Sequence, residues 1–288
     1  MSECSVDKKS DPIKSIQDEI ISSTLSKIKY KIFVMSGKGG VGKSSVATNL
    51  AVALAEMGCK VGLLDVDIHG PSVPHLLGLK GLLEVDEHKF IKPKQFNANL
   101  KVVSMECLLE DPDQAILWRG PMKTSAIRQF VSEVDWGELD FLVIDSPPGT
   151  GDEPMTVLKT IPEALCVVVT TPQEVSLADV RKAINFLQYA KANILGIVEN
   201  MSGLICPHCH REISLFKKGG GADLAQKLNL DFLGEIPLDP ATVVAGDLGK
   251  PVVLLPEDSF AKKAFLDLAR RVKEKAENSL EAIASVHK

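Results

Sequence analysis

The chain has 288 residues, of which 45% are hydrophobic and 25% charged, and its formal net charge is −5. This length fits one large α/β domain, and the weakly acidic balance provides no basic surface for nucleic acid. No apolar run approaches the roughly 18 to 20 residues that a membrane-spanning helix requires. We therefore expect partners that are small molecules or proteins, and no binding to nucleic acid or membrane.

The N-terminal residues, MSECSVDKKSDPIKS, have neither the apolar core of a signal peptide nor the acid-poor, arginine-rich composition of a transit peptide. We therefore expect a cytoplasmic protein, whose six cysteines are mainly reduced thiols. Residues 1–28 are polar and mixed, which predicts an N-terminal arm that is flexible or partly helical, with a helix across Ile13 to Ile28. Residues 29–288 are predicted to form one domain.

Short apolar runs between turn residues predict seven strands, at residues 31–36, 60–66, 100–105, 141–146, 164–171, 194–198 and 231–236. Continuous apolar strands are typical of a parallel sheet that is covered on both faces. Helical periods lie between the strands. The alternation predicts a doubly wound α/β fold with a mainly parallel sheet, helices on both faces, and ligands at the carboxyl ends of the strands.

Three helices are predicted from apolar residues at helical spacing. Their stripes are Val46, Leu50, Leu54 and Met57; Leu177, Val180, Ile184 and Leu187; and Ala261, Phe265, Leu268 and Val272. Ser176 and Asp179 are spaced as a capping box for the second helix. We expect the third helix, at about residues 259–284, to pack on the sheet with a solvated basic face. A helix lying on a membrane surface is the alternative.

A glycine-rich loop follows the first predicted strand. Its sequence, GKGGVGKS, fits the phosphate-binding pattern G-x-x-x-x-G-K-[ST] between a strand and a helix. The glycines let backbone N–H groups turn toward phosphates, and the helix that begins near Lys43 directs its positive end at the same anion. Lys43 would neutralise the outer phosphates and Ser44 would offer its hydroxyl to Mg²⁺. The predicted nucleotide site comprises Gly37, Lys38, Gly39, Gly40, Val41, Gly42, Lys43, Ser44 and Ser45.

Carboxylates follow two other predicted strands. In FLVIDSPPGTGDE, Asp145 ends an apolar run, which is the pattern of a Walker B aspartate that holds Mg²⁺ through water. In GLLDVDIHG, Asp65 and Asp67 lie two residues apart and point to opposite sides of an extended chain. We favour Asp67 as the residue that orients the attacking water, because it lies further past the strand end, with Asp65 as a structural or Mg²⁺-shell residue.

Lys38 is a second lysine in a loop that already has Lys43. Its side chain either extends into solvent or reaches the nucleotide of another subunit. In the second case it would stabilise transition-state charge as an arginine finger does, after two subunits close. Spacing alone leaves both possibilities open.

Only Cys206 and Cys209, in CPHC, have the spacing of a ligand pair. Tetrahedral iron or zinc sites commonly need four ligands, and the chain has no second C-x-x-C motif. Two such pairs that meet at the two-fold axis of a dimer would supply four thiolates. A zinc site completed by His208 and His210, a dithiol redox pair and a tight turn are the alternatives. Cys59 and Cys166 are expected in the core, and Cys107 is undetermined.

These motifs together resemble a known family. GKGGVGKS is similar to the deviant Walker A signature of the MinD, ParA and nitrogenase-iron-protein class of dimeric P-loop ATPases. From about Lys31 to Leu268 the chain resembles the Mrp/ApbC branch of iron–sulfur cluster carrier ATPases. The segments that carry this resemblance are SGKGGVGKSS, LLDVDIHGPSVPHLLG, WRGPM, DFLVIDSPPGTGDE, TTPQEVSLADV, VENMSG, CPHC and FLGEIPLDP.

The resemblance implies a P-loop NTPase fold and a homodimer in which Lys38 contacts the nucleotide of the facing subunit. It also implies that Asn200 recognises adenine, with Pro237 to Asp239 lining the base. An asparagine amide can both donate to and accept from an adenine edge. For Cys206 and Cys209, the resemblance favours a [4Fe-4S] cluster that bridges two subunits.

We therefore predict an ATPase that hydrolyses ATP slowly, receives a bridging [4Fe-4S] cluster from a donor and delivers it to apo iron–sulfur proteins. Lys43, Ser44 and Asp145 would hold Mg·ATP. The main alternative is a MinD/ParA-like positioning ATPase that acts on membrane or nucleoid, which explains Lys38 but leaves CPHC without a purpose. A nitrogenase-reductase-like electron donor would need cysteines near Asp145, where SPPGTGDEP has none.

Overall fold

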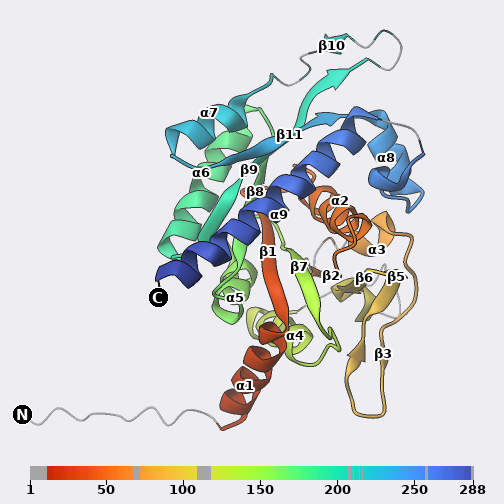
Figure 1. The fold of residues 1–288 in the computed structure, drawn as a ribbon, viewed down its shortest axis with the longest axis vertical. Coiled ribbons are helices and arrows are strands. Elements are labelled where there is room, and N and C mark those ends of the chain that lie inside the picture. Colours follow the sequence, from red (N-terminus) through yellow and green to blue (C-terminus); the bar gives the residue numbers. More distant parts are fainter. Residues whose placement is uncertain are drawn as a thin grey trace, which may run out of the picture.

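A mostly parallel sheet lies at the centre of the molecule (Figure 1). The computed structural model describes residues 12–67, 70, 72–108, 118–206, 209, 211–213, 215, 217–256 and 259–286. In spatial order the strands are β10 (Glu212–Ile213), β9 (Asn193–Ile205), β8 (Leu165–Thr170), β1 (Ile28–Ser36), β7 (Leu139–Asp145), β2 (Val61–Asp65), β6 (Leu100–Ser104) and β5 (Lys94–Asn97), and β11 (Phe232–Leu238) pairs with β9. All seven predicted strands are confirmed.

The antiparallel strands are additions that the apolar runs do not predict. β5 pairs antiparallel with β6, and β10 pairs antiparallel with β9. A separate hairpin joins β3 (Glu84–Val85) to β4 (Ile91–Lys92). Each of these strands is short and at least partly exposed, so no continuous apolar run marks it.

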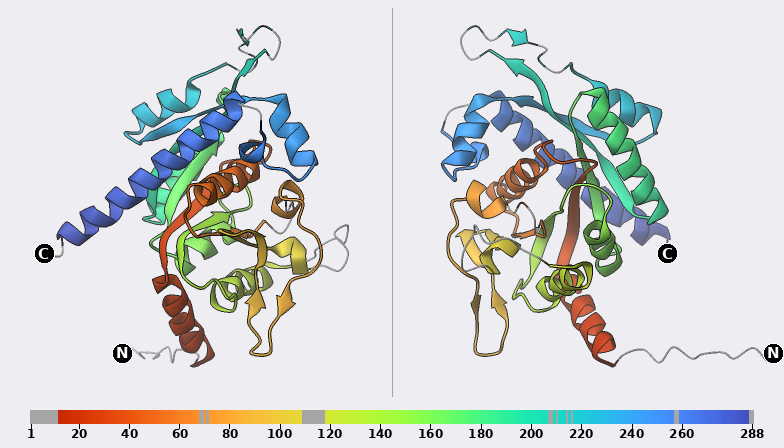
Figure 2. Two further views of the ribbon diagram at one scale, coloured as in Figure 1. Left: turned by 45° about the vertical axis from the view of Figure 1, so that its right-hand side comes forward. Right: turned by 180° about the vertical axis from the view of Figure 1, so that it is seen from behind.

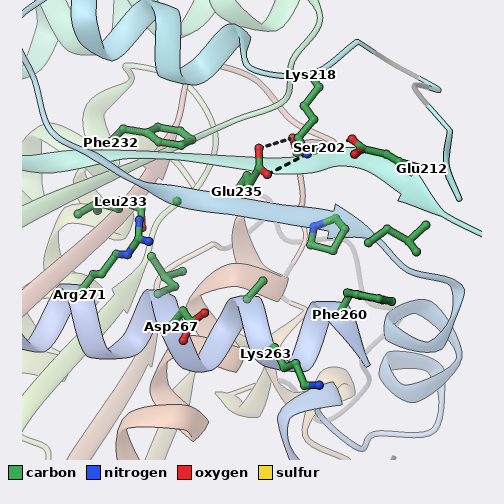
Figure 3. A pocket seen from close by; sticks show the side chains of 15 residues that line it. Ser202, Glu212, Lys218, Phe232, Leu233, Glu235, Phe260, Lys263, Asp267 and Arg271 are labelled. Atoms are coloured by element: carbon green, nitrogen blue, oxygen red, sulfur yellow. Dashed lines mark hydrogen bonds and ion pairs between the residues drawn. The ribbon is translucent and has the colours of Figure 1, made fainter. Parts of the chain in front are cut away.

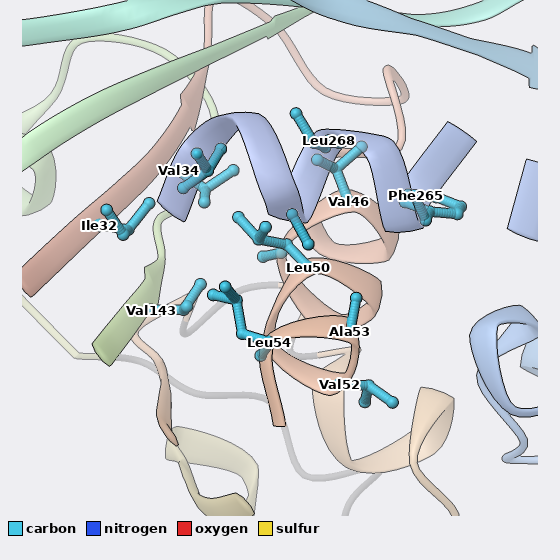
Figure 4. Packing of buried hydrophobic residues seen from close by; sticks show 14 of the residues in the cluster. Ile32, Val34, Val46, Leu50, Val52, Ala53, Leu54, Val143, Phe265 and Leu268 are labelled. Atoms are coloured by element: carbon cyan, nitrogen blue, oxygen red, sulfur yellow. The ribbon is translucent and has the colours of Figure 1, made fainter. Parts of the chain in front are cut away.

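Helices cover both faces of the sheet, as the views in Figure 2 show. They are α1 (Pro12–Ser26), α2 (Lys43–Glu56), α3 (Val73–Leu76), α4 (Gly120–Ser132), α5 (Asp152–Thr160), α6 (Glu174–Tyr189), α7 (Gly220–Lys227), α8 (Pro240–Asp247) and α9 (Phe260–Val286). Alternate residues of β1 serve two cores. Phe33 and Met35 pack with α4, α5 and α6, whereas Ile32 and Val34 pack with α2 and α9 (Figure 4).

The predicted helical stripes face these cores. Met57 is partly buried, and the other members of the first two stripes are buried. The predicted capping box is wrong, because α6 begins at Glu174 and its N-cap is Gln173. Ser176 therefore lies inside the first turn, where its buried hydroxyl pairs with Thr171 Oγ1 at 2.5 Å.

The N-terminal arm contributes a packed helix. Ile21 and Leu25 of α1 are buried in the core that contains α4. Arg128 of α4 forms an ion pair with Asp18 at 2.5 Å. The predicted helix ends at Ser26 rather than Ile28, because Ile28 is the first residue of β1 and pairs with Leu139.

The last helix packs on the molecule as expected. Ala261, Phe265, Leu268 and Val272 of α9 are buried, in contact with α2 and β11. This apolar stripe is therefore unavailable to a membrane surface. Within the described ranges, the helices lack the combined length and apolarity that crossing a membrane would require.

Candidate functional site

The glycine-rich loop connects β1 to α2 at the carboxyl end of the sheet. Gly40 and Gly42 both have φ 77°, in the left-handed region that favours glycine. Gly42 is the N-cap of α2, so the N–H groups of the first helical turn, from Lys43 onward, face the loop. A cavity of about 350 Å³ lies over the loop, lined by residues 38–45 together with Asp67, Ser72 and Pro148. This is the geometry of an anion site.

Lys43 and Asp145 form a buried pair at this site. Lys43 Nζ donates to Asp145 Oδ1 at 2.6 Å and lies 3.1 Å from Ser44 Oγ. Burial raises the pKa of Asp145, and the Lys43 ammonium opposes that shift. Asp145 Oδ2 is buried and accepts no hydrogen bond from the described residues. A buried carboxylate oxygen without a donor fits a cation such as Mg²⁺, with the Ser44 hydroxyl beside it.

The two aspartates of β2 and the following loop occupy different places. Asp67 lines the cavity, and its Oδ1 accepts a hydrogen bond from Gly70 N at 3.2 Å. Asp65 is buried and does not line the cavity, and it accepts hydrogen bonds from Asp67 N at 3.0 Å and Ser104 Oγ at 2.9 Å. Burial raises the pKa of Asp65 well above its usual range, and the charge of Asp145 adds to the shift. Asp67 is therefore the carboxylate that faces the phosphate cavity.

Lys38 lies on the wall of the same cavity and is partly buried. Its backbone carbonyl accepts a hydrogen bond from Ser36 Oγ at 2.9 Å, which fixes the start of the loop. Its ammonium has no carboxylate partner within salt-bridge distance among the residues that the structure describes. The two lysines of the loop therefore differ, since Lys43 is paired with a carboxylate and Lys38 has no such partner in the part of the chain that the structure describes.

Asn200 has a contact that the sequence does not predict. Its buried amide Nδ2 donates to the carbonyl of Val41 in the glycine-rich loop at 2.9 Å. Pro237 lies on β11, where its neighbour Ile236 pairs with Asn200. Asp239 caps α8 by accepting from Ala241 N at 2.9 Å. None of the three lines the phosphate cavity as the structure describes it, so their predicted contacts with adenine remain predictions.

The cysteine pair lies on a hairpin that projects beyond the carboxyl end of the sheet (Figure 1). β9 continues past its pairing with β8, and β10 returns beside it. The backbone N–H of Cys206 donates to the carbonyl of Arg211 at 3.0 Å, which closes the hairpin end. Cys206 is partly buried and Cys209 is exposed.

Among the described residues of the hairpin, Cys206 and Cys209 are the two thiols. In the described part of the chain, no group of three or more histidine, cysteine, aspartate or glutamate side chains is placed to hold a metal. His208 and His210, which the zinc alternative requires, lie outside the described residues.

The other described cysteines are buried in the fold. Cys59 and Cys166 are core residues as predicted, and Cys107 is buried as well. Burial raises the pKa of Cys107 to about 11 and that of Cys166 to about 12. These thiols are poor metal ligands at neutral pH, because the thiolate is the binding form.

Comparisons with known proteins place the chain in a family. Residues 27–273 match the ParA family model, described as NUBPL iron-transfer P-loop NTPase. An iron-sulfur cluster carrier protein of Methanocaldococcus jannaschii is 47% identical over 266 residues, which cover 92% of this chain and 91% of that one. A cytosolic Fe-S cluster assembly factor Nubp2 homolog of Drosophila yakuba is 48% identical over 83% of this chain and 94% of its own.

A solved structure shares both sequence and fold. It is a nucleotide-binding protein of Archaeoglobus fulgidus in complex with ADP, 44% identical, with a TM-score of 0.72 over 81% of this chain and 91% of that one. The family model covers most of the chain, and it includes both the glycine-rich loop and the cysteine hairpin. The chain belongs to the ParA family of P-loop NTPases, in the group described as NUBPL iron-transfer P-loop NTPases.

Proposed function

We propose that the protein is an ATP-dependent carrier that holds a [4Fe-4S] cluster between two subunits and delivers it to apo iron–sulfur proteins in the cytoplasm. The observation that carries this proposal is the pair formed by Cys206 and Cys209, presented on a hairpin that projects from the same end of the sheet as the phosphate cavity. The names of the relatives from Methanocaldococcus and Drosophila support it.

ATP is the substrate of the glycine-rich loop. Its phosphates would be bound by the backbone N–H groups of the loop and by Lys43, at the positive end of α2. Ser44 and Asp145 would hold Mg²⁺, whose chemistry is to neutralise charge on the phosphates. Asp67, on the cavity wall, accepts a hydrogen bond from the attacking water and orients it.

In a homodimer, each chain would supply groups that complete the nucleotide site and the cluster site of the other. Lys38, on the cavity wall and without a carboxylate partner among the described residues, would reach the nucleotide of the facing subunit. Two hairpins that meet across a two-fold axis bring four thiolates to one cluster. Hydrolysis is slow, because the transition state is fully stabilised only in the closed dimer.

The positioning ATPase is less well supported. The exposed hairpin with its two thiols has no role in binding a membrane or nucleoid, and the apolar stripe of α9 is buried. Sedimentation with liposomes or DNA tests this alternative directly. Strong ATP-dependent pelleting would favour the positioning function over the carrier.

Anaerobic reconstitution with ferrous iron and sulfide tests the carrier function. We expect visible absorption of a [4Fe-4S] cluster and, from iron, sulfide and protein determinations, one cluster per two chains. The double variant Cys206→Ala with Cys209→Ala should bind no cluster while it still binds ADP. Cys59→Ala removes a buried core thiol and is the matched control, which should load normally. A cluster that remains in the double variant, or a loaded species that light scattering shows to be a single chain, would refute the proposal.

A further inference from the structure

The strand that leads to the cysteines, β9, forms a buried contact with the glycine-rich loop. Asn200 of β9 donates to the carbonyl of Val41, and a Cβ atom at Gly42 would lie only 2.3 Å from Asn200 Nδ2. The loop backbone therefore packs directly on this side chain, with no room for a larger residue between them. A shift of the loop at residues 41 and 42 displaces β9 at residue 200, because the contact is buried and close-packed.

The neighbouring residue, Glu199, ties the same strand to the segment that returns from the hairpin. Glu199 is fully buried, and its Oε1 accepts hydrogen bonds from Ser202 Oγ at 2.6 Å and Gly219 N at 2.9 Å. Its Oε2 accepts from Gly221 N at 2.5 Å. Gly219 is the N-cap of α7, so the carboxylate also faces the positive end of that helix. The Glu199 side chain therefore joins β9, which leads into the hairpin, to the start of α7, which follows the hairpin.

The other polar contacts at the base of the hairpin are exposed or only partly buried. Lys218 Nζ lies 3.0 Å from both Glu212 Oε1 and Glu235 Oε1, and Ser202 Oγ, whose proton is directed at Glu199, lies 3.3 Å from Glu235 Oε2 (Figure 3). The side chains of Lys218 and Glu235 are 40% and 42% exposed, and ion pairs in such positions contribute little. Glu199 is therefore the stronger polar link at this base.

Only a short length of chain separates these contacts from the cysteines. Six residues of strand, from Asn200 to Cys206, span at most about 20 Å. Within them Met201 has φ 57° and Gly203 has φ 71°. A left-handed conformation at methionine is sparsely populated, so the surrounding contacts must hold it. The pairing of β9 with β11 also shifts register between Ile236 and Leu238. β9 therefore bends at the point where Glu199 and Asn200 anchor it.

We propose that Glu199 is a positioning residue that transmits the state of the glycine-rich loop to the cysteine hairpin. Nucleotide that orders the loop fixes Asn200 through the carbonyl of Val41, and Glu199 passes this constraint to the start of α7. The described strands of the hairpin, at residues 203–206 and 211–213, are then held in one orientation with nucleotide and are freer without it. The importance of this linkage for cluster retention rests on the proposed carrier function, but the linkage itself does not.

Amide hydrogen exchange on the cluster-free protein, with and without Mg·ADP, tests the linkage. In the wild type we expect Mg·ADP to slow exchange in residues 203–221 by at least about fivefold, the lower end of typical coupling between sites. Glu199→Gln should bind ADP with unchanged affinity and keep the slowing in the glycine-rich loop. It should lose the slowing in residues 203–221, because an amide nitrogen replaces one oxygen that accepts a backbone N–H.

Glu235→Gln is the matched control. Glu235 lies directly opposite Glu199 in the β9–β11 pairing, and the same chemical change there leaves the contacts of Glu199 with Gly219 and Gly221 in place. We expect it to retain the ADP-dependent slowing. Ser202→Ala removes one donor to Glu199 and should reduce the slowing partially, which keeps the test informative if Glu199→Gln fails to fold.

Two results would overturn the linkage. One is a wild-type protein whose residues 203–221 exchange at the same rate with and without Mg·ADP, although ADP is bound. The other is a slowing that is undiminished in folded Glu199→Gln or, if that variant does not fold, undiminished in Ser202→Ala. Both results are independent of the reconstitution experiment, so failure of the linkage and failure of the carrier function are separate outcomes.

Discussion

The nucleotide site and the cysteine hairpin lie at the same end of the sheet and differ in how deeply their functional side chains are buried. Lys43, Asp67 and Asp145 are buried, and strand ends and the loop hold them in place. Cys209 is exposed and Cys206 only partly buried, on a hairpin that projects from the sheet. The first site is built into the core, whereas the second lies at the surface.

Two sets of lysine–carboxylate ion pairs, one in each region, should differ in how much they stabilise the folded protein. The side chains of Lys43 and Asp145 are 6% and 0% exposed, so both charges have lost their hydration. Their mutual attraction offsets the free-energy cost of that loss. The side chains of Lys218, Glu212 and Glu235 are 40% to 46% exposed. Water therefore solvates these charges and weakens their ion pairs. Substitutions in the two arrangements should therefore have very different effects.

The largest effect is expected for Lys43→Met. It leaves Asp145 buried without its cation, and loss of one partner of a buried pair typically costs about 3–5 kcal/mol of unfolding free energy. The variant should also bind ADP at least about 100-fold more weakly, since a charge-assisted contact to phosphate is lost. Urea denaturation and titration with a fluorescent ADP analogue measure the two effects. Normal ADP affinity in this variant would contradict the assigned site.

Lys38→Ala should separate binding from catalysis. We expect nearly unchanged ADP affinity and a loss of ATP hydrolysis of about 10³-fold, the lower range for a charge supplied in trans. Steady-state phosphate release measures the rate.

Mixed dimers sharpen the assignment of Lys38. When Lys38→Ala and Asp67→Asn chains are combined in equal amounts, half of the dimers are mixed and each has one intact site, so roughly a quarter of wild-type activity should return. If the mixture stays inactive although mixed dimers form, Lys38 does not act on the partner's nucleotide.

The buried carboxyls should make the nucleotide-free protein less stable as pH rises. Burial raises the pKa of Asp65 and Asp145 in the folded state, so that state binds protons more tightly than the unfolded chain does. The free energy of unfolding therefore falls as pH rises from the ordinary carboxyl pKa of about 4 through the raised values. Asp65→Asn should flatten this dependence in urea denaturation at a series of pH values. A stability that increases over the same range would show that the carboxyls are paired more strongly than this structure indicates.

The smallest effect is expected for Lys218→Ala. Its ion pairs are exposed, so the unfolding free energy should change by less than about 1 kcal/mol. Urea denaturation under the conditions used for Lys43→Met provides the comparison. A loss as large as that of Lys43→Met would mean that the base of the hairpin is part of the cooperative core.

Much of the fold follows from local patterns in the sequence. Continuous apolar runs mark the seven main strands, because residues buried on both faces of a parallel sheet must all be apolar. The glycine-rich loop is equally local, since Gly40 and Gly42 need positive φ and Lys43 begins the helix that follows them. The proximity of Cys206 and Cys209 is likewise local, because it follows from their C-x-x-C spacing in the sequence.

Tertiary structure alone decided the contacts between distant segments. Asn200 lies 159 residues from Val41, and Glu199 joins amides at Gly219 and Gly221. For Asp67 and Asp65 the sequence favours the first by its position past the strand end, and the structure adds the reason that Asp65 is kept from the cavity, which is its hydrogen bond with Ser104 of the neighbouring strand. Short-range spacing determines which elements form, since backbone geometry repeats every few residues. Which buried polar groups meet depends on how the strands are ordered, and no local pattern contains that order.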